Sequence, residues 1–437
     1  MNANRTLGLA CIVLLPILLT GCASDKIYRH RFSECTVSSS ALDACAAHSL
    51  QRYNAGEANE YSLAFVEVDD QGQLRDREQL KLIKDRFNEI AGSEPGVLLH
   101  VFVHGWHHNA AADPEDPNIT SFRDTLQAVS AAEDEISARQ QLPRRKVLGV
   151  YVGWRGESIA LPGIRYLTFW DRKSTAEEVG HLGVSEILLT LEEIRNVKNT
   201  QDSPVKSRLV IMGHSFGGAV IYTAAAQILA SRFINTALNK GYADDPQGLG
   251  DLVVLLNPAF QALNFAPLYD LAQSRCSYSP EQKPKLVILT SEGDQATATA
   301  FPLGRVFSTF FETHNTLTRQ GASSCGRPLK LAEGAADRAA VGHFQPLITH
   351  TLTRIEKPSA KLDLFEMSSL WKGQEDRATT LFGSTKLTHL GKTHPHNPFL
   401  NVRVSKDIIP DHNDIFKEEI AEFLRGLIVL TGSHSDR

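Results

Sequence analysis

The sequence predicts an α/β fold in which a mostly parallel sheet is covered by helices on both faces. Short apolar runs alternate with segments of helical periodicity through most of the chain, which is the pattern of successive strand–helix units. Several runs are nearly continuous rather than alternating, as is typical of strands buried on both faces. Because such strands run parallel, we expect the functional groups at their carboxyl ends.

Length and composition narrow the function classes. The chain has 437 residues, of which 42% are hydrophobic, enough for one large domain with insertions or for two domains. A formal net charge of −5 provides no basic footprint, so we expect no nucleic-acid partner. The sequence has no CxxC pair of the kind that binds zinc or does redox work, and we expect no cofactor and no metal.

Residues 1–21 are expected to be a signal peptide. Arg5 precedes an apolar run, Leu7 to Thr20, that is too short to span a bilayer comfortably. The run ends in Leu19-Thr20-Gly21-Cys22, which resembles a bacterial lipoprotein signal; an ordinary secretory signal with an incidental cysteine is the alternative. The resemblance implies a lipid anchor on Cys22. No aspartate follows this cysteine, which implies the outer membrane, facing the periplasm.

Six cysteines are present, of which one would leave with the signal peptide and Cys22 would be lipidated. An exported chain can oxidise the remaining four. Several pairings are possible, and we predict the local one, Cys35–Cys45 with Cys276–Cys325. Residues 22–57 are expected to form an irregular N-terminal linker tied by the first of these disulfides.

The first half of the chain then continues as regular strand–helix units. Each predicted strand is an apolar run that ends at a polar turn, and each predicted helix has apolar residues at helical spacing. The strands are predicted at 61–68, 96–103 and 146–154, and the helices at 76–91, 120–140 and 182–198. An apolar, aromatic stretch at 159–170 has two interpretations: it lines an acyl pocket or touches lipid, or it is a loop packed on the core.

Gly213-His214-Ser215-Phe216-Gly217-Gly218 lies between a predicted strand at 209–212 and a predicted helix at 219–229. A G-x-S-x-G motif between a strand and a helix is typical of a nucleophile elbow, where the serine occupies a sharp, strained turn. Gly213 and Gly217 would remove bulk beside it, and the helix would direct its N–H groups at the site. A glycine-rich turn with a buried serine is the alternative.

His104-Gly105-Trp106 follows the predicted strand at 96–103 and resembles the oxyanion loop of α/β-hydrolases. The resemblance implies that the backbone N–H groups of Trp106 and Phe216 form an oxyanion hole. A metal site is the competing interpretation, because His104, His107 and His108 cluster, but their spacing fits no metal motif.

The second half supplies three more predicted strands and a terminal helix. The strands lie at 251–256, 285–290 and 399–404, and the helix at 414–429. Residues 299–395 are less regular, and we interpret them as a large insertion beside the site and a candidate cap. The predicted core therefore comprises 58–298 and 396–430.

A serine nucleophile needs a histidine base, and that base needs a carboxylate. Of the histidines, His412 follows the final predicted strand and precedes the final helix, so its position makes it the candidate base. Asp294 follows the strand at 285–290 and is the candidate acid; Glu292 is its rival. The order Ser215, Asp294, His412 is the order of triad residues in α/β-hydrolases.

Over roughly 60–305 and 398–429 the chain is similar to the α/β-hydrolase superfamily, in its esterase/lipase-like branch. The resemblance implies a serine hydrolase that cleaves small-molecule or lipid carboxylic esters through an acyl-enzyme, with Ser215, His412 and Asp294 as its triad. The motif does not separate esterases from thioesterases or peptidases. A cell-envelope peptidase or amidase, or a non-catalytic envelope interaction protein, are therefore the alternatives.

Overall fold

The computed structural model describes most of the chain. The predicted signal peptide, Cys22, Cys325 and residues 159–168 lie outside the described residues. The described ranges are 26–37, 43–112, 114–158, 169–240, 245–309, 312–319, 329–356 and 367–432.

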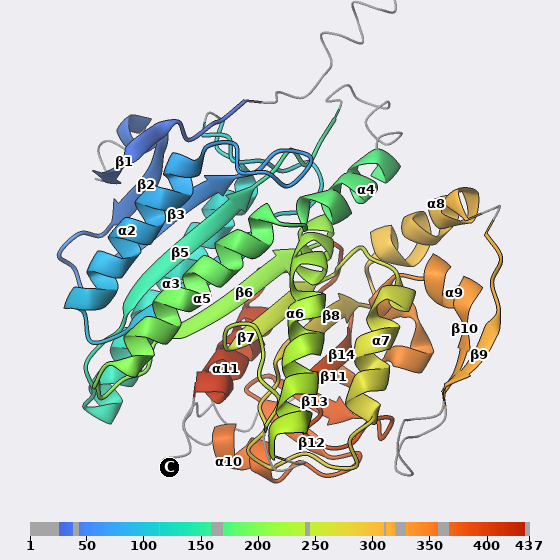
Figure 1. Ribbon diagram of the computed structural model, residues 1–437. Helices are drawn as coiled ribbons and strands as arrows, with labels where there is room; N and C mark the ends of the chain where they lie inside the picture. The colour runs from blue at the N-terminus through green and yellow to red at the C-terminus, as the bar shows by residue number, and fades with distance from the viewer. Residues whose placement is uncertain are drawn as a thin grey trace, which may run out of the picture.

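A twelve-stranded sheet runs through the molecule in the order β1-β2-β3-β5-β4-β6-β7-β8-β14-β11-β13-β12 (Figure 1). From β3 to β11 in this order every neighbouring pair is parallel, which confirms the predicted mostly parallel sheet. These strands are β3 (Tyr61–Glu67), β4 (Val97–Val103), β5 (Lys146–Gly153), β6 (Arg208–His214), β7 (Leu252–Leu256), β8 (Leu286–Ser291), β11 (His350–Arg354) and β14 (Phe399–Val404).

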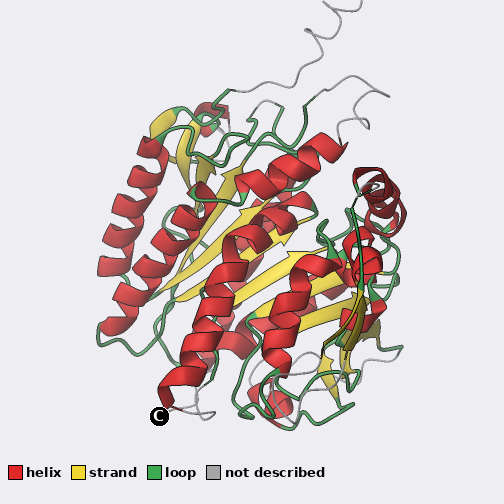
Figure 2. Ribbon diagram, turned by 45° about the vertical axis from the view of Figure 1, so that its right-hand side comes forward, coloured by secondary structure: helices red, strands yellow, loops and turns green. Residues whose placement is uncertain are grey.

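Helices cover both faces of this sheet (Figure 2). Neighbouring strand residues point to opposite faces, so that Val101 packs in one core and Phe102 in the other. The first core lies under α2 (Arg77–Ser93), α4 (Phe169–Val179), α5 (Gly183–Thr200), α6 (Phe216–Lys240) and α7 (Ala262–Gln273). The second lies under α3 (Pro117–Gln140) and α11 (Glu418–Gly432).

Helix α6 is apolar because it covers the middle of the sheet. Among the described residues it is the one helix that is long and apolar enough to cross a bilayer, and 56% of that stretch is buried inside the molecule. A buried core helix is hydrophobic on most sides for the same reason. Its composition therefore reflects its place in the core.

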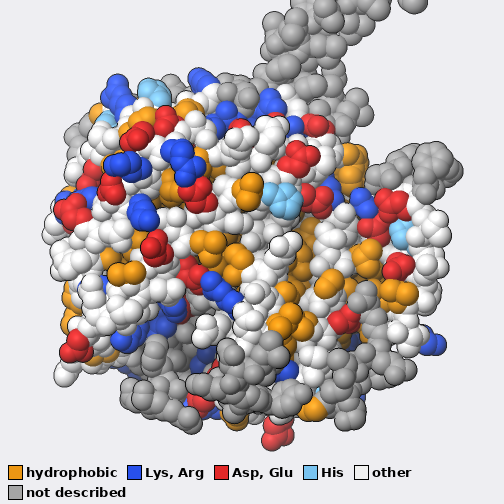
Figure 3. Space-filling view, in the orientation of Figure 1, with side chains coloured by type: hydrophobic (Ala, Val, Ile, Leu, Met, Phe, Trp, Pro, Cys, Tyr) orange, Lys and Arg blue, Asp and Glu red, His pale blue; other side chains and the backbone are white. Residues whose placement is uncertain are grey.

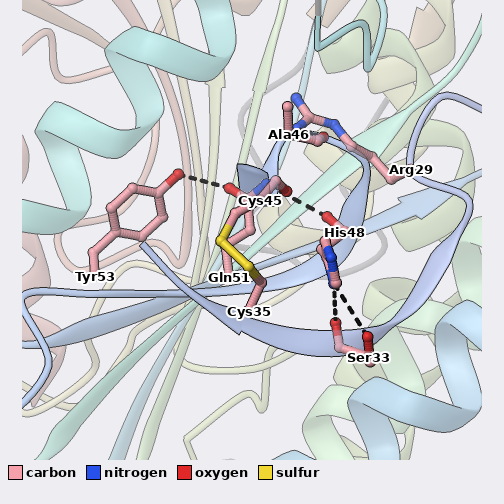
Figure 4. The surroundings of a disulfide bond; sticks show 8 residues. All are labelled: Arg29, Ser33, Cys35, Cys45, Ala46, His48, Gln51 and Tyr53. Atoms are coloured by element: carbon pink, nitrogen blue, oxygen red, sulfur yellow. Dashed lines mark hydrogen bonds between the residues drawn. A yellow bond between two sulfur atoms is a disulfide. The ribbon is translucent and has the colours of Figure 1, made fainter. Parts of the chain in front are cut away.

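The N-terminal segment is more regular than predicted. Within 22–57, β1 (Arg31–Thr36) and β2 (His48–Tyr53) form an edge of the sheet, where β2 pairs antiparallel with β3. The sequence hides these strands because they carry few apolar residues and β1 is largely exposed. The predicted disulfide Cys35–Cys45 joins β1 to the turn before β2 (Figure 4). Cys276 is also disulfide-bonded, and its predicted partner Cys325 lies outside the described residues.

The predicted insertion 299–395 is not a single unit. Its second half adds β11, β13 (Thr385–His389) and β12 (Thr379–Phe382) to the large sheet beyond β14. Threonines and histidines interrupt these short strands, and pairing with neighbours stabilises them instead of an apolar run. The first half forms α8 (Phe301–Ser308), α9 (Glu333–Arg338) and the hairpin β9 (Thr316–Arg319)–β10 (Leu329–Ala332), and α9 packs on α7.

Candidate active site

Ser215, Asp294 and His412 come together at the carboxyl edge of the sheet. Ser215 follows β6, Asp294 follows β8, and His412 lies in the loop between β14 and α11. These strands are close neighbours in the sheet, separated by β7 alone. Parallel strands end at one edge, and this shared edge explains how residues far apart in sequence meet.

The backbone at Ser215 is strained, as a nucleophile elbow requires. Its φ of 54° lies in the left-handed region, which a residue with a side chain rarely adopts. A hydrogen bond from Ser215 N to Leu256 O, 3.0 Å, holds the turn against β7. There is no room for a side chain at Gly217, where a Cβ would lie 2.1 Å from Val103 O. At Gly213 a Cβ would lie 2.6 Å from Gly217 O.

His412 contacts both partners. Its Nε2 lies 2.8 Å from Ser215 Oγ, and its Nδ1 lies 2.8 Å from Asp294 Oδ1. The second contact is too bent for a regular hydrogen bond, which is common in unliganded catalytic sites. An ionised Asp294 favours the proton on Nδ1 and leaves the Nε2 lone pair free to accept the serine hydroxyl proton.

Asp294 is built to stay ionised. Burial of its side chain by itself would raise its pKa, but the close contact with His412, the charge of that ring and two hydrogen bonds from Thr297 outweigh burial and lower the pKa below its ordinary value. Thr297 donates from its N to Asp294 Oδ1, 3.0 Å, and from its hydroxyl to Oδ2. The rival Glu292 is exposed, so Asp294 is the carboxylate that faces His412.

The loop after β4 lies directly beside the serine. A Cβ on Gly105 would lie 2.9 Å from Ser215 Cβ, so only glycine fits there. His104 is fully buried with its pKa lowered to about 4 by burial, and it is therefore neutral. Trp154 N–H donates to its Nε2, 3.0 Å, so Nδ1 carries the proton and donates to Gly105 O, 2.9 Å.

This bond also orients the next N–H group. The C=O and N–H of a trans peptide point in opposite directions, so the fixed Gly105 carbonyl fixes the direction of the Trp106 N–H. Phe216 is the first residue of α6, and its N–H has no acceptor within the helix. Both predicted oxyanion donors thus belong to backbone that is held next to Ser215.

Two residues that the sequence did not single out hold His412 in place. His214 Nε2–H donates to the His412 carbonyl, 2.9 Å, and Asn257 Nδ2 donates to the same oxygen, 2.8 Å. Burial lowers the pKa of His214 to about 3, so this donor stays neutral. A histidine inside the Gly213–Gly218 motif and an asparagine at the end of a buried strand were the available signals.

A second missed chain of hydrogen bonds supports Asp294 from behind. The Thr297 hydroxyl gives its one proton to Asp294, so it accepts from His343 Nε2, 2.9 Å away. His343 comes from the predicted insertion, and burial lowers its pKa. The insertion therefore contributes to the site through this contact.

Aromatic side chains form one wall beside the elbow. Phe169 packs on Phe216 and Trp106, with ring centroids 4.9 Å and 5.1 Å away. Trp170 packs on Phe301 of α8, 5.9 Å between centroids. The described end of the 159–170 stretch therefore lies next to the serine, and the remainder of that stretch lies outside the described residues.

The histidines of the loop after β4 do not converge on one point. His107 Nδ1 lies 2.8 Å from Glu157, and His108 Nδ1 lies 2.9 Å from Asp116. A different group with metal-ligand chemistry is formed by Glu312, His314 and Asp337, but Arg305 already binds both Asp337 oxygens. Comparison with family models, with curated proteins and with solved structures finds no match to this chain.

Proposed function

We propose that this protein is a serine hydrolase that cleaves carboxylic esters through an acyl-enzyme. The observation that carries the proposal is the pair of 2.8 Å contacts that link Ser215 Oγ, the His412 ring and Asp294. A strained serine next to a histidine base with an ionised carboxylate behind it is the arrangement that makes a hydroxyl nucleophilic.

In the proposed reaction Ser215 Oγ attacks the ester carbonyl carbon while His412 Nε2 takes the hydroxyl proton. Asp294 stabilises the imidazolium that forms. The N–H groups of Trp106 and Phe216 hold the oxyanion of the tetrahedral intermediate. His412 then protonates the leaving alcohol, and a water activated by the same ring releases the acid and restores Ser215. Residues of this chain supply every catalytic group in these reaction steps.

The proposed setting is the bacterial cell envelope, with Cys22 lipidated and the protein anchored in the outer membrane, facing the periplasm. The lipoprotein-like sequence before Cys22 supports this placement. The proposed substrate is an ester of an apolar acyl chain. The wall of Phe169, Phe216 and Trp106 beside the elbow supports this choice, because apolar walls favour apolar acyl groups.

Labelling by a fluorophosphonate probe tests the activated serine. Wild type without its signal peptide is expected to label strongly, and Ser215→Ala and His412→Ala are expected to abolish labelling. The matched controls are Ser174→Ala and His181→Ala, which change exposed residues and should label like wild type. A folded wild type that does not label would remove the proposal and favour an envelope interaction protein.

A substrate panel tests the bond that is cleaved. Esters of graded acyl length should be hydrolysed, with the longer chains preferred if the aromatic wall receives them. Hydrolysis of amide but not ester substrates would replace the ester proposal with a cell-wall peptidase or amidase.

A further inference from the structure

The chain enters the fold at the same edge of the sheet as Ser215. The carboxylate of Glu67, the last residue of β3, accepts hydrogen bonds from Tyr28 N, 3.0 Å, and Arg29 N, 2.9 Å. The Arg29 side chain is fully buried, donates to Ala110 O, 2.9 Å, and stacks 4.0 Å over the Phe65 ring. Lys26 lines a cleft of about 190 Å³ beside the loop after β4. The start of the described chain is therefore pinned to the carboxyl edge.

The predicted anchor is close to this point along the chain. Four residue steps separate Cys22 from Lys26, and a fully extended chain covers at most about 14 Å in that distance. Strands β3 and β6 are three strand spacings apart, which is also about 14 Å. A seven-residue strand such as β4 is about 23 Å long, so the amino edge of the sheet lies beyond the reach of this tether.

The carboxyl edge also exposes apolar side chains on α8. Leu303 is 61% exposed and Val306 is 47% exposed, and they lie three residues apart on one side of the helix. The opposite side is fixed to the protein, because Phe301 packs on Trp170 and Arg305 binds Asp337. Helix α8 thus lies beside α4, next to the aromatic wall (Figure 1). Its apolar side is turned to solvent.

We propose that the carboxyl edge of the sheet docks on the bilayer that holds the Cys22 anchor, with Leu303 and Val306 in contact with lipid. The inference rests on the proposed function, and it narrows the substrate to an acyl ester that resides in that bilayer. The short tether selects the lipid surface as the occupant of the apolar side of α8. A bilayer ester would reach Ser215 without passing through water.

The first test compares two valines of similar exposure. Val306 lies on α8, whereas Val197, 52% exposed, lies near the end of α5. That end is at the amino edge, because Asn199 bonds to Ser207 just before β6. Hydrophobic side chains also lie on the face that carries α5 and α6, so exposure alone does not mark the docking side (Figure 3).

Lipidated wild type, Val306→Asp and Val197→Asp are reconstituted in vesicles of phosphatidylethanolamine and phosphatidylglycerol that contain a fluorogenic long-chain ester. Val306→Asp is expected to lower hydrolysis of the vesicle ester about tenfold, since one valine is lost from the lipid contact. Val197→Asp should remain within about twofold of wild type. All three should hydrolyse a soluble butyrate ester equally. Equal rates of all three on the vesicle ester would overturn the docking, while soluble turnover would still support the hydrolase.

A second readout does not depend on activity. Val306→Cys and Val197→Cys are labelled with an environment-sensitive fluorophore, and a nitroxide on the lipid acyl chains serves as quencher. Docking predicts a blue shift and quenching at position 306 only. Equal quenching at both positions, or at neither, would overturn it even if the serine proved inactive. Failure of the full chain to associate with membranes would remove the anchor and the docking together.

Discussion

Two buried aspartates lie at opposite ends of the same parallel sheet and differ in their partners. Asp251, at the amino edge just before β7, binds Arg208, 3.1 Å, and Arg195, 2.5 Å, and accepts from Leu209 N, 2.8 Å. Asp294, at the carboxyl edge, faces His412 and Thr297. Both carboxylates have a pKa below the ordinary value, because these partners outweigh the burial that by itself would raise it.

The difference shows that the partner decides what a buried carboxylate can do. A guanidinium stays charged, so Asp251 holds two fixed cations together and contributes to the fold. An imidazole gains and loses a proton near neutral pH, so Asp294 can stabilise a charge that exists only during a reaction. Two residues at the carboxyl edge, Ser215 and Asn257, also have a left-handed backbone, with φ of 54° and 43°.

The largest expected effect comes from Asp294→Asn. An amide next to Nδ1 favours the wrong imidazole tautomer, which places a proton on Nε2 and prevents it from accepting one from Ser215. We expect kcat on a soluble ester to fall by about 10⁴-fold with little change in stability. Steady-state kinetics and thermal unfolding measure the two. A variant that lost stability in proportion to activity would place Asp294 with Asp251 as a structural carboxylate.

Asp251→Asn should have the opposite effect, a loss of stability with no loss of activity. Removing the negative charge takes the Asp251 carboxylate away from the buried Arg208, and we expect the free energy of unfolding to fall by about 3 kcal/mol. The folded fraction should keep its kcat. Chemical denaturation gives the stability. Asp85→Asn is the control, since Asp85 is an exposed partner of Lys81 and should change stability by no more than about 0.5 kcal/mol.

Acid should lower the stability of the fold, because it protonates the two buried aspartates. An aspartate with a lowered folded-state pKa contributes stability above its unfolded pKa of about 3.9 and loses it as the pH falls through the folded value. We therefore expect wild type to lose stability below about pH 4. Asp251→Asn should flatten this loss, which denaturation over a pH series would show. An unchanged slope in the variant would mean that Asp251 is not a major acid-sensitive group.

The sequence predicts the centre of this molecule better than its edges. The parallel strands beside Ser215 are continuous apolar runs, and burial on both faces leaves few alternatives for them. At one edge, β1 and β2 depend on pairing and on the Cys35–Cys45 disulfide, which hydrophobic periodicity does not report. At the other, β11 reads His-Thr-Leu-Thr-Arg and is a strand because β13 and β14 flank it.

The same distinction holds within the site. Chain order and strand ends predicted that Ser215, Asp294 and His412 would meet, because the fold brings strand ends to one edge. The contacts that hold the site together were not predictable in this way. Asn257 reaches the His412 carbonyl across 155 residues, and His343 reaches Thr297 from a segment interpreted as an insertion. Such contacts depend on side-chain directions that no local pattern encodes.

The smallest expected effect concerns His214, which holds the His412 backbone without touching the reacting atoms. His214→Leu removes one of two donors to the His412 carbonyl, and we expect kcat to fall about tenfold while KM stays nearly unchanged. His214→Gln keeps an N–H donor at similar reach and should restore most of the rate.

The same residue affects stability in acid. Because burial lowers the pKa of His214 to about 3, the folded protein binds fewer protons at this residue than the unfolded chain does at mildly acidic pH. His214 therefore destabilises the fold as the pH falls below about 6.5. Both variants should therefore lose less stability in acid than wild type, whereas only His214→Leu should lose activity. If the glutamine variant were as slow as the leucine variant, the hydrogen bond to the His412 carbonyl would not be what positions the base.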